Sequence, residues 1–215
     1  KTAAQKGSTL AFVSKGIQLL GWIETTDRLR ESTVSAIKFA QQSNLEVIML
    51  TGDRDETAQQ IAKECGITTV VSNVRPDEKA DYISKLQQDG ACVAMVGDGI
   101  NDAAALATAD VGIAMGAGSD IALDSADIVL IRNDLLDAVS ALELGQVTMR
   151  KIRSNLGWAF AYNLIGIPLA MGLLLPWTGW LLPPAFAAAA MSLSSLSVVA
   201  NSLTLRWWRP RLPSV

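Results

Sequence analysis

Short apolar runs and helical spacings of apolar residues alternate along the first two thirds of the chain. Residues 45–50 form a run typical of a buried strand, whereas residues 30–42 carry apolar side chains at helical spacing. Strands that alternate with helices predict an α/β fold with a parallel sheet. The expected strands cover residues 9–13, 18–23, 45–50, 69–71, 93–97, 111–115 and 127–131, and the expected helices residues 30–42, 55–65, 76–89 and 120–126.

The last third of the chain has a different pattern. Residues 134–153 predict one long helix, and residues 154–205 that follow contain no charged side chain. Residues 156–175 and 185–205 are each long enough to cross a bilayer, and they predict a hairpin of two transmembrane helices. The alternative, a buried helical hairpin of a soluble core, is disfavoured because a polar face is lacking.

Charge gives the hairpin an orientation. Up to Arg153 there are 15 basic and 21 acidic residues, whereas residues 206–215 contain three arginines and no acid. Basic residues therefore flank both outer ends of the hairpin, and the positive-inside rule places these ends and the α/β domain in the cytoplasm. We expect a multi-pass protein of the plasma or inner membrane. The mildly acidic α/β part argues against nucleic acid as a partner.

Other residue types exclude some kinds of site. The chain has no histidine, so it can form neither a histidine metal site nor a Ser-His triad. Cys65 and Cys92 lack CxxC spacing and are expected to be buried structural thiols. The first residue is Lys1, and we expect the chain to be an excerpt from a longer protein.

A cluster of acidic and amide side chains follows the strand at residues 93–97. Gly97-Asp98-Gly99 forms the predicted turn, and Asn101 and Asp102 open an alanine-rich helix. Ligands of open α/β sheets bind at such strand ends, and the two glycines would let a ligand approach the backbone. Two carboxylates suit Mg²⁺ together with phosphate oxygens. An acidic turn with a helix cap remains the plain alternative.

Three segments in order resemble phosphotransferases of the haloacid dehalogenase type. They are Thr51-Gly52-Asp53 after a strand, Lys79 on a helix, and residues 97–102 after another strand. A hydroxyl and backbone amides hold phosphoryl oxygens in this chemistry, while a lysine neutralises charge and carboxylates hold Mg²⁺. Taken alone, Lys79 would be an ordinary solvated lysine.

The nucleophilic aspartate of these enzymes has no clear place in the chain. Residues 53–57, Asp-Arg-Asp-Glu-Thr, imitate a DxDxT nucleophile motif after a strand. The chain would then be a membrane-anchored small-molecule phosphatase that uses Asp53. Thr51 and Gly52, which intervene between the strand and Asp53, disfavour that interpretation.

The same motifs followed by two spans resemble the C-terminal part of a P-type ATPase. The resemblance implies a junction with an upstream nucleotide-binding domain at residues 1–23, a phosphorylation domain at 24–153, the last two membrane helices at 154–206 and a cytoplasmic tail at 207–215. The nucleophile motif Asp-Lys-Thr-Gly-Thr would lie upstream, so this chain alone should not hydrolyse ATP.

The resemblance also implies roles for the motif residues. Asp98 would bind Mg²⁺, with Asp102 as second choice. Thr51, Gly52, Asp53, Lys79, Asn101 and Asp102 would line the pocket of the aspartyl phosphate.

The two spans resemble those of copper(I)-transporting members. Asn155, Tyr162-Asn163 and Pro168 match the next-to-last span, and residues 191–195, Met-Ser-Leu-Ser-Ser, match the last. Tyr162, Asn163, Met191 and Ser195 would bind Cu⁺, and a copper chaperone is an implied partner.

The chemistry of these side chains agrees with a soft monovalent ion. Asn155 and Tyr162 share a helix face, as do Met191 and Ser195. Pro168 cannot donate to the carbonyl of Leu164, so the helix can loosen there. A thioether with neutral oxygens suits Cu⁺ or Ag⁺, and the lack of an intramembrane carboxylate disfavours Zn²⁺. Plain helix packing is the alternative for the methionine and the serines.

The sequence therefore predicts part of an ATP-driven copper(I) exporter. The phosphatase that uses Asp53 is the second hypothesis, and a regulatory hairpin that only binds partners is the third.

Overall fold

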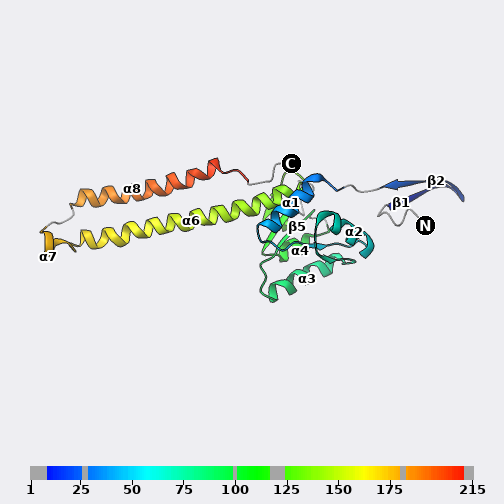
Figure 1. Cartoon of the computed structure of the whole chain (residues 1–215), viewed down its shortest axis with the longest axis horizontal. Coiled ribbons are helices and arrows are strands. Elements are labelled where there is room, and N and C mark those ends of the chain that lie inside the picture. Colours follow the sequence, from blue (N-terminus) through cyan, green and yellow to red (C-terminus); the bar gives the residue numbers. More distant parts are fainter. Residues whose placement is uncertain (1–8, 26–28, 99–100, 117–123, 180–182, 211–215) are drawn as a thin grey trace. The chain divides into compact units, whose positions relative to one another are not determined.

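The computed structural model describes residues 9–25, 29–98, 101–116, 124–179 and 183–210. The chain divides into two compact units, one ending at Ser140 and the other beginning at Ala141. The long helix α6 (Leu135–Ala170) contains this boundary. Figure 1 shows the elements of both units.

The first unit has parallel strands that alternate with helices (Figure 1). Its parallel strands are β3 (Ile48–Leu50), β4 (Thr69–Val71), β5 (Ala94–Gly97), β6 (Val111–Met115) and β7 (Ile128–Leu130), and its helices are α1 (Glu31–Gln42), α2 (Asp55–Cys65), α3 (Pro76–Gln88) and α4 (Ala103–Thr108). The pairs β3–β4, β5–β6 and β6–β7 are all parallel. The predicted α/β fold with a parallel sheet is confirmed. The helix predicted at 120–126 falls largely outside the described residues.

The parallel strands form two ladders rather than one continuous sheet. β3 pairs with β4, whereas β5, β6 and β7 form a three-stranded ladder. Within the described ranges no ladder connects the two groups. One long edge of β3 and one of β5 thus lack a strand partner in this part of the chain.

Helix boundaries follow the local signals of the sequence. Gly66 ends α2 with a positive φ of 75°, which a residue without a side chain adopts at low cost. Pro76 occupies the first turn of α3, and the Glu78 carboxylate accepts a 2.9 Å hydrogen bond from the backbone N–H of Arg75. These contacts fix the start of α3, which carries Lys79.

The core beside the three-stranded ladder depends on close approach of α4 to β6. Leu106 and Ala114 are buried there, with Met95 and Val129 packed against them. A Cβ atom on Gly112 would lie 2.5 Å from the carbonyl oxygen of Leu106. Only glycine allows that approach without a backbone shift.

The Asp110 side chain, just before β6, forms a hydrogen bond with the backbone just before β5. Its carboxylate accepts a 2.8 Å hydrogen bond from the backbone N–H of Val93. That bond, with a smaller contribution from the Gln87 side chain, lowers the pKa of Asp110. A lowered pKa means that this contact stabilises the fold above the ordinary pKa of an aspartate, and the stabilisation is lost as the pH falls through the lowered value.

The two cysteines differ. Cys65 is buried, and burial raises the pKa of its thiol, helped by the nearby Glu64 carboxylate. Cys92 is exposed, so the prediction of a buried thiol was wrong there. It lies in the segment that precedes β5 and not within the strand itself, which explains the difference.

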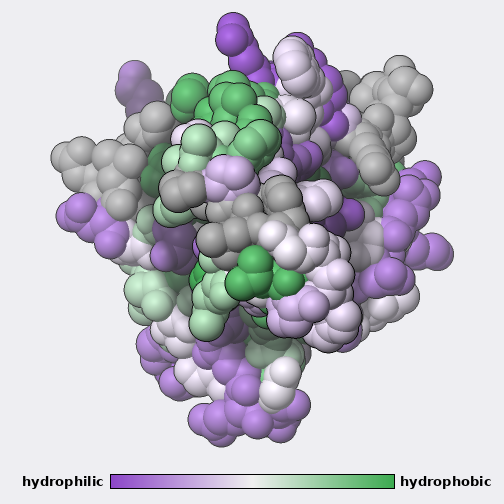
Figure 2. All heavy atoms as spheres, turned by 90° about the vertical axis from the view of Figure 1, so that its left-hand side faces the viewer, coloured by the Kyte–Doolittle hydropathy of each residue, from purple (hydrophilic) through white to green (hydrophobic). Residues whose placement is uncertain are grey.

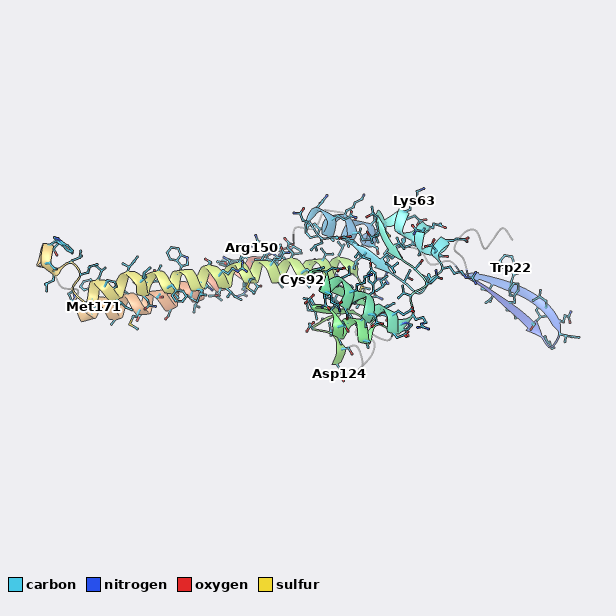
Figure 3. The ribbon with its side chains drawn as sticks, turned by 90° about the horizontal axis from the view of Figure 1, so that it is seen from below. Trp22, Lys63, Cys92, Asp124, Arg150 and Met171 are labelled. Atoms are coloured by element: carbon cyan, nitrogen blue, oxygen red, sulfur yellow. The ribbon has the colours of Figure 1, made fainter. Side chains whose placement is uncertain are left out.

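The strands predicted at residues 9–13 and 18–23 are present as β1 (Thr9–Lys15) and β2 (Gln18–Thr25), and they pair as an antiparallel hairpin. Its turn uses Gly16, with φ of 63°. Phe12 and Trp22 are more than half exposed on it, and Trp22 is labelled in Figure 3.

The second unit is a helical hairpin made of the remainder of α6 and α8 (Pro184–Leu203). The short helix α7 (Leu175–Thr178) lies between them, and the 3-10 helix η2 (Thr204–Trp207) follows α8. Figures 1 and 3 both show α6 and α8 side by side. The view from the α7 end shows hydrophobic residues (green) and residues of intermediate hydropathy (pale) at the surface (Figure 2).

One helical stretch of the described chain, Ala188–Trp207, is long and apolar enough to cross a membrane. It corresponds to the span predicted at 185–205. The span predicted at 156–175 does not meet the same criterion, because α6 ends at Ala170 and carries the polar residues Asn155 and Asn163. A clear pair of spans is therefore not evident from length and hydropathy alone.

Leu106→Ala should lower the free energy of unfolding by about 2–5 kcal/mol, because it removes a fully buried side chain and leaves a cavity. Ile131→Ala is the matched control, since Ile131 is 89% exposed. Urea denaturation of the detergent-solubilised chain, followed by circular dichroism, measures both. Equal losses in the two variants would contradict this account of the core.

Candidate functional site

The turn after β3 is fixed by backbone and side-chain hydrogen bonds. The Thr51 hydroxyl donates to the Asp53 carboxylate at 3.0 Å and accepts from the Asp53 backbone N–H at 3.1 Å. Thr51 also donates its N–H to the carbonyl of Val71, and its own carbonyl accepts from the N–H of Val74, each at 3.0 Å. A Cβ on Gly52 would lie 3.2 Å from the Val74 carbonyl oxygen, a tight contact. Thr51, Gly52 and Asp53 are thus held against residues 71–74.

Helix α3 begins two residues after Val74, and its Lys79 forms an ion pair with Asp102. Lys79 Nζ lies 2.6 Å from Asp102 Oδ1, and the two side chains are only 13% and 12% exposed. Asp102 is the one buried charged residue of the described chain. A largely buried pair at this distance combines Coulomb attraction with a charge-assisted hydrogen bond. Lys79 is therefore not an ordinary solvated lysine.

Gly97 makes room for Asp102. A Cβ on Gly97 would lie 2.5 Å from Asp102 Oδ2 and 2.9 Å from its Cβ. The sequence predicts that glycines beside Asp98 let a ligand approach the backbone. At Gly97 the approaching group is instead the Asp102 side chain, and Gly99 lies outside the described residues.

Asp98 and Asn101 are exposed near the carboxyl end of β5. In the described ranges no three Asp, Glu, His or Cys side chains are grouped to hold a metal. The donors at this sheet edge are instead the two carboxylates of Asp98 and Asp102. Such a pair fits Mg²⁺, which takes one or two protein carboxylates and completes its shell with phosphate oxygens and water.

Asp53 and Asp55, the two aspartates of the DxDxT-like run, both have hydrogen-bond partners nearby. The Asp53 carboxylate accepts the Thr51 hydroxyl, and the Asp53 carbonyl accepts the Asn73 N–H at 2.8 Å. Asp55, the second aspartate of the DxDxT-like run, begins α2 and accepts the Ser72 hydroxyl at 2.8 Å. These bonds give both carboxylates structural partners in the turn.

The residues predicted to bind Cu⁺ lie on the two long helices of the second unit. Tyr162 and Met191 are 38% and 71% exposed. The Asn163 amide donates to the carbonyl of Ala159 at 2.9 Å, and the Ser195 hydroxyl donates to that of Met191 at 3.5 Å. Both bonds stay within one helix. The helix continues through Pro168 to Ala170 and is not broken at the proline.

A polar network that the sequence reasoning missed connects the helices elsewhere. The Asn155 amide donates to the Ser202 hydroxyl at 2.9 Å and accepts from the Asn201 amide at 2.6 Å. Lys151 donates to Asn201 Oδ1 at 2.8 Å. We call Lys151, Asn155, Asn201 and Ser202 the polar clasp. The sequence feature that could have predicted this network is the presence of one asparagine, Asn155 or Asn201, in each of two otherwise apolar helices.

Comparison with known families decides the family. The family model for haloacid dehalogenase-like hydrolases matches residues 1–110, and a second model with the same description matches residues 79–142. The chain belongs to the haloacid dehalogenase-like hydrolases. The resemblance based on the Thr51, Lys79 and 97–102 segments is confirmed.

Curated relatives extend the similarity to nearly the whole chain. A probable copper-transporting ATPase, PacS, of Synechococcus elongatus is 50% identical over 95% of this chain and 27% of its own length. A copper-exporting P-type ATPase of Vibrio cholerae is 47% identical, with coverages of 96% and 22%. A silver exporting P-type ATPase of Salmonella typhimurium is 45% identical, with coverages of 95% and 25%. The chain thus spans about a quarter of the length of these relatives, and its resemblance to copper-transporting P-type ATPases is confirmed.

A solved structure agrees with this assignment. A zinc-transporting PIB-type ATPase in the E2.Pi state is 34% identical, with a TM-score of 0.77 over 95% of this chain and 32% of that one. The dehalogenase-like unit and the helical hairpin therefore both have counterparts in a P-type ATPase.

Lys79→Met should destabilise this haloacid dehalogenase-like unit by about 3–5 kcal/mol, because it leaves the Asp102 carboxylate buried without its cation. Adding Asp102→Asn should restore part of the loss, since the neutral amide needs no counter-ion. Lys85→Met, on the same helix, is the control. Urea denaturation of the parent, Lys79→Met, Asp102→Asn, the double variant and the control measures the coupling, and additive losses in the double variant would contradict the pairing.

Proposed function

We propose that this chain is part of an ATP-driven exporter of Cu⁺, or of Ag⁺, that works through an aspartyl phosphate. The observation that carries the proposal is the largely buried Lys79–Asp102 pair, which joins α3 to the start of α4 next to Asp98 in the sequence. In the relatives named for copper or silver transport, the matching region is 45–50% identical. The nucleophilic aspartate, the nucleotide-binding domain and the remaining membrane helices would lie upstream in the same polypeptide.

The proposed reaction has two steps. The γ-phosphoryl group of ATP passes to a carboxylate oxygen of the upstream aspartate as its bond to the ADP oxygen breaks. Water then attacks phosphorus, which releases inorganic phosphate and restores the carboxylate. Thr51 and the Gly52 amide would hold phosphoryl oxygens, and Lys79 would neutralise their charge. Asp53 would orient Thr51, whose hydroxyl it already accepts.

Asp98 would hold Mg²⁺, with Asp102 as the second choice because Lys79 already engages its carboxylate. When bound, Mg²⁺ neutralises charge on the phosphoryl oxygens. Asn101, exposed next to Asp102, would contact the same phosphate group.

The split ladder supports an upstream nucleophile. β3 ends at the Thr51 turn and β5 at Gly97-Asp98, and each has an edge without a strand partner in the described chain. A parallel strand inserted between them would bring its carboxyl end next to both sites. The strand that carries the phosphorylated aspartate would occupy this position.

The proposal places both long helices of the hairpin in the membrane. Arg150, Lys151 and Arg153 flank one outer end, and Arg206 and Arg209 the other, so both ends would be cytoplasmic. The solved zinc-transporting relative supports this placement because its similarity extends over the hairpin. The α/β unit would then lie in the cytoplasm, where a copper chaperone could deliver Cu⁺.

The polar clasp supports the Cu⁺ site through helix register. Asn155 contacts Ser202 across the antiparallel hairpin. Tyr162 lies seven residues after Asn155, and Ser195 seven residues before Ser202, so each returns to the same face two turns further from the clasp. Tyr162 and Ser195 would therefore be level with each other, with Asn163 and Met191 beside them.

Met191→Ala or Asn163→Ala in the full-length transporter should abolish copper-stimulated phosphorylation by ATP, since each removes a Cu⁺ ligand. Met171→Ala is the matched control because Met171 is 82% exposed just beyond α6 (Figure 3). Copper-free phosphorylation by inorganic phosphate should persist in all three variants and shows that the unit remains folded. Normal copper stimulation of Met191→Ala would refute the site.

The chain by itself should not hydrolyse p-nitrophenyl phosphate above the level of its Asp53→Asn variant, because the nucleophile would be upstream. Turnover that Asp53→Asn abolishes would instead establish the alternative, a membrane-anchored phosphatase.

A further inference from the structure

A cavity of about 540 Å³ lies entirely within the second unit, at the end of the hairpin that carries the polar clasp. One wall comes from α6, with Glu143, Arg150, Lys151 and Ser154 among its residues, and the other from Trp208 and Arg209. Arg150 is labelled in Figure 3. The proposed transport site, two helical turns further along the hairpin, uses none of these residues.

The cavity has an excess of positive charge. Among the described residues that line it, three side chains are cationic and one, Glu143, is a carboxylate. The Arg150 Nε contact goes to the backbone carbonyl of Gln146 at 3.4 Å, and Lys151 donates to the neutral amide oxygen of Asn201. Arg150 and Arg209 both line this cavity. Their guanidinium groups can each donate two parallel hydrogen bonds to a phosphate.

The polar clasp holds the third cation in place. Lys151 bonds to Asn201, which in turn bonds to Asn155 on the same helix as Lys151. A lysine held in this way loses less side-chain freedom when it binds an anion. The ammonium group is therefore fixed on the cavity wall.

The position of the cavity indicates which phosphate it would meet. The apolar stretch Ala188–Trp207 ends directly before Trp208 and Arg209, so the cavity lies where a hydrocarbon layer would give way to lipid headgroups. Leu156 and Leu203, both more than half exposed, continue from it along the two helices. They provide an apolar surface for acyl chains below a bound headgroup.

We propose that this cavity binds the phosphate of an anionic phospholipid from the cytoplasmic leaflet, a placement that rests on the proposed membrane position of the hairpin. Arg150, Lys151 and Arg209 contact the phosphate oxygens, and Trp208 packs at the level of the glycerol backbone. An anionic lipid is preferred to a zwitterionic one, because the cationic headgroup of the latter is repelled by the same three side chains.

The test measures retained lipid on the full chain. The chain is placed in nanodiscs of phosphatidylcholine with or without phosphatidylglycerol, and the lipids that remain after detergent extraction are counted by native mass spectrometry. Arg150→Gln/Arg209→Gln should weaken phosphatidylglycerol retention by about tenfold for each lost arginine contact. Phosphatidylglycerol retention by Arg150→Lys/Arg209→Lys should lie between that of the parent and that of the glutamine variant, since lysine keeps the charge but cannot form the bidentate contact.

Arg153→Gln/Arg206→Gln is the matched control. It removes the same charge from the same helix ends, but neither arginine lines the cavity. It should retain phosphatidylglycerol nearly as the parent does. Equal losses in the two double variants would show general surface attraction and overturn the site, as would no loss in either.

A competition experiment with soluble phosphates distinguishes a bound phospholipid from a bound free anion. Glycerol 3-phosphate or inorganic phosphate should not displace the bound lipid, because neither occupies the apolar surface below the cavity. Displacement by either would assign the cavity to a soluble phosphate and overturn the lipid proposal. Failure of the chain to enter both kinds of nanodisc would overturn the membrane position itself, whereas loss of lipid preference alone would leave the transport function standing.

Discussion

The ion pair between Lys79 and Asp102 is the contact on which the candidate phosphate site depends. It joins the start of α3 to the start of α4, two elements separated in sequence by a complete strand. Because both side chains are nearly buried, each needs the other to offset the loss of water. Gly97 belongs to the same arrangement, since any side chain there would displace the Asp102 carboxylate. The carboxyl end of β5 is thus fixed by the Lys79–Asp102 ion pair and by the absence of a side chain at Gly97.

Much of the fold could be predicted from local signals. The bounds of α2 and α3 follow from Gly66 and from Pro76 with Glu78, because these residues act on backbone groups within a single turn. Two segments of the candidate phosphate site, residues 51–53 and 97–102, were also recognisable, since each comes at the end of a strand. The partner of Lys79 was not, because a contact over 23 residues depends on how two helices pack and leaves no periodic trace in the sequence.

In the second unit, the membrane spans were harder to identify in the structure than in the sequence. Length and the absence of charge predicted two spans, yet the polar residues of α6 lower its hydropathy enough that only Ala188–Trp207 stands out. One of them, Asn155, makes side-chain contacts with Asn201 and Ser202 of the neighbouring helix. Asn155 and Asn201 matter through their side-chain amides, which are costly to expose to hydrocarbon and therefore pair with each other. In a mean hydropathy these asparagines only lower the value, and their contact with each other is not visible.

The divided ladder has a consequence for handling the chain apart from its upstream segments. Backbone N–H and C=O groups along the inner margins of β3 and β5 can accept an extended peptide from any source. In the complete polypeptide a neighbouring segment would satisfy them during synthesis. When the chain is produced separately, other copies of the same chain are the nearest source of an extended segment, and these unpaired strand edges become a starting point for self-association.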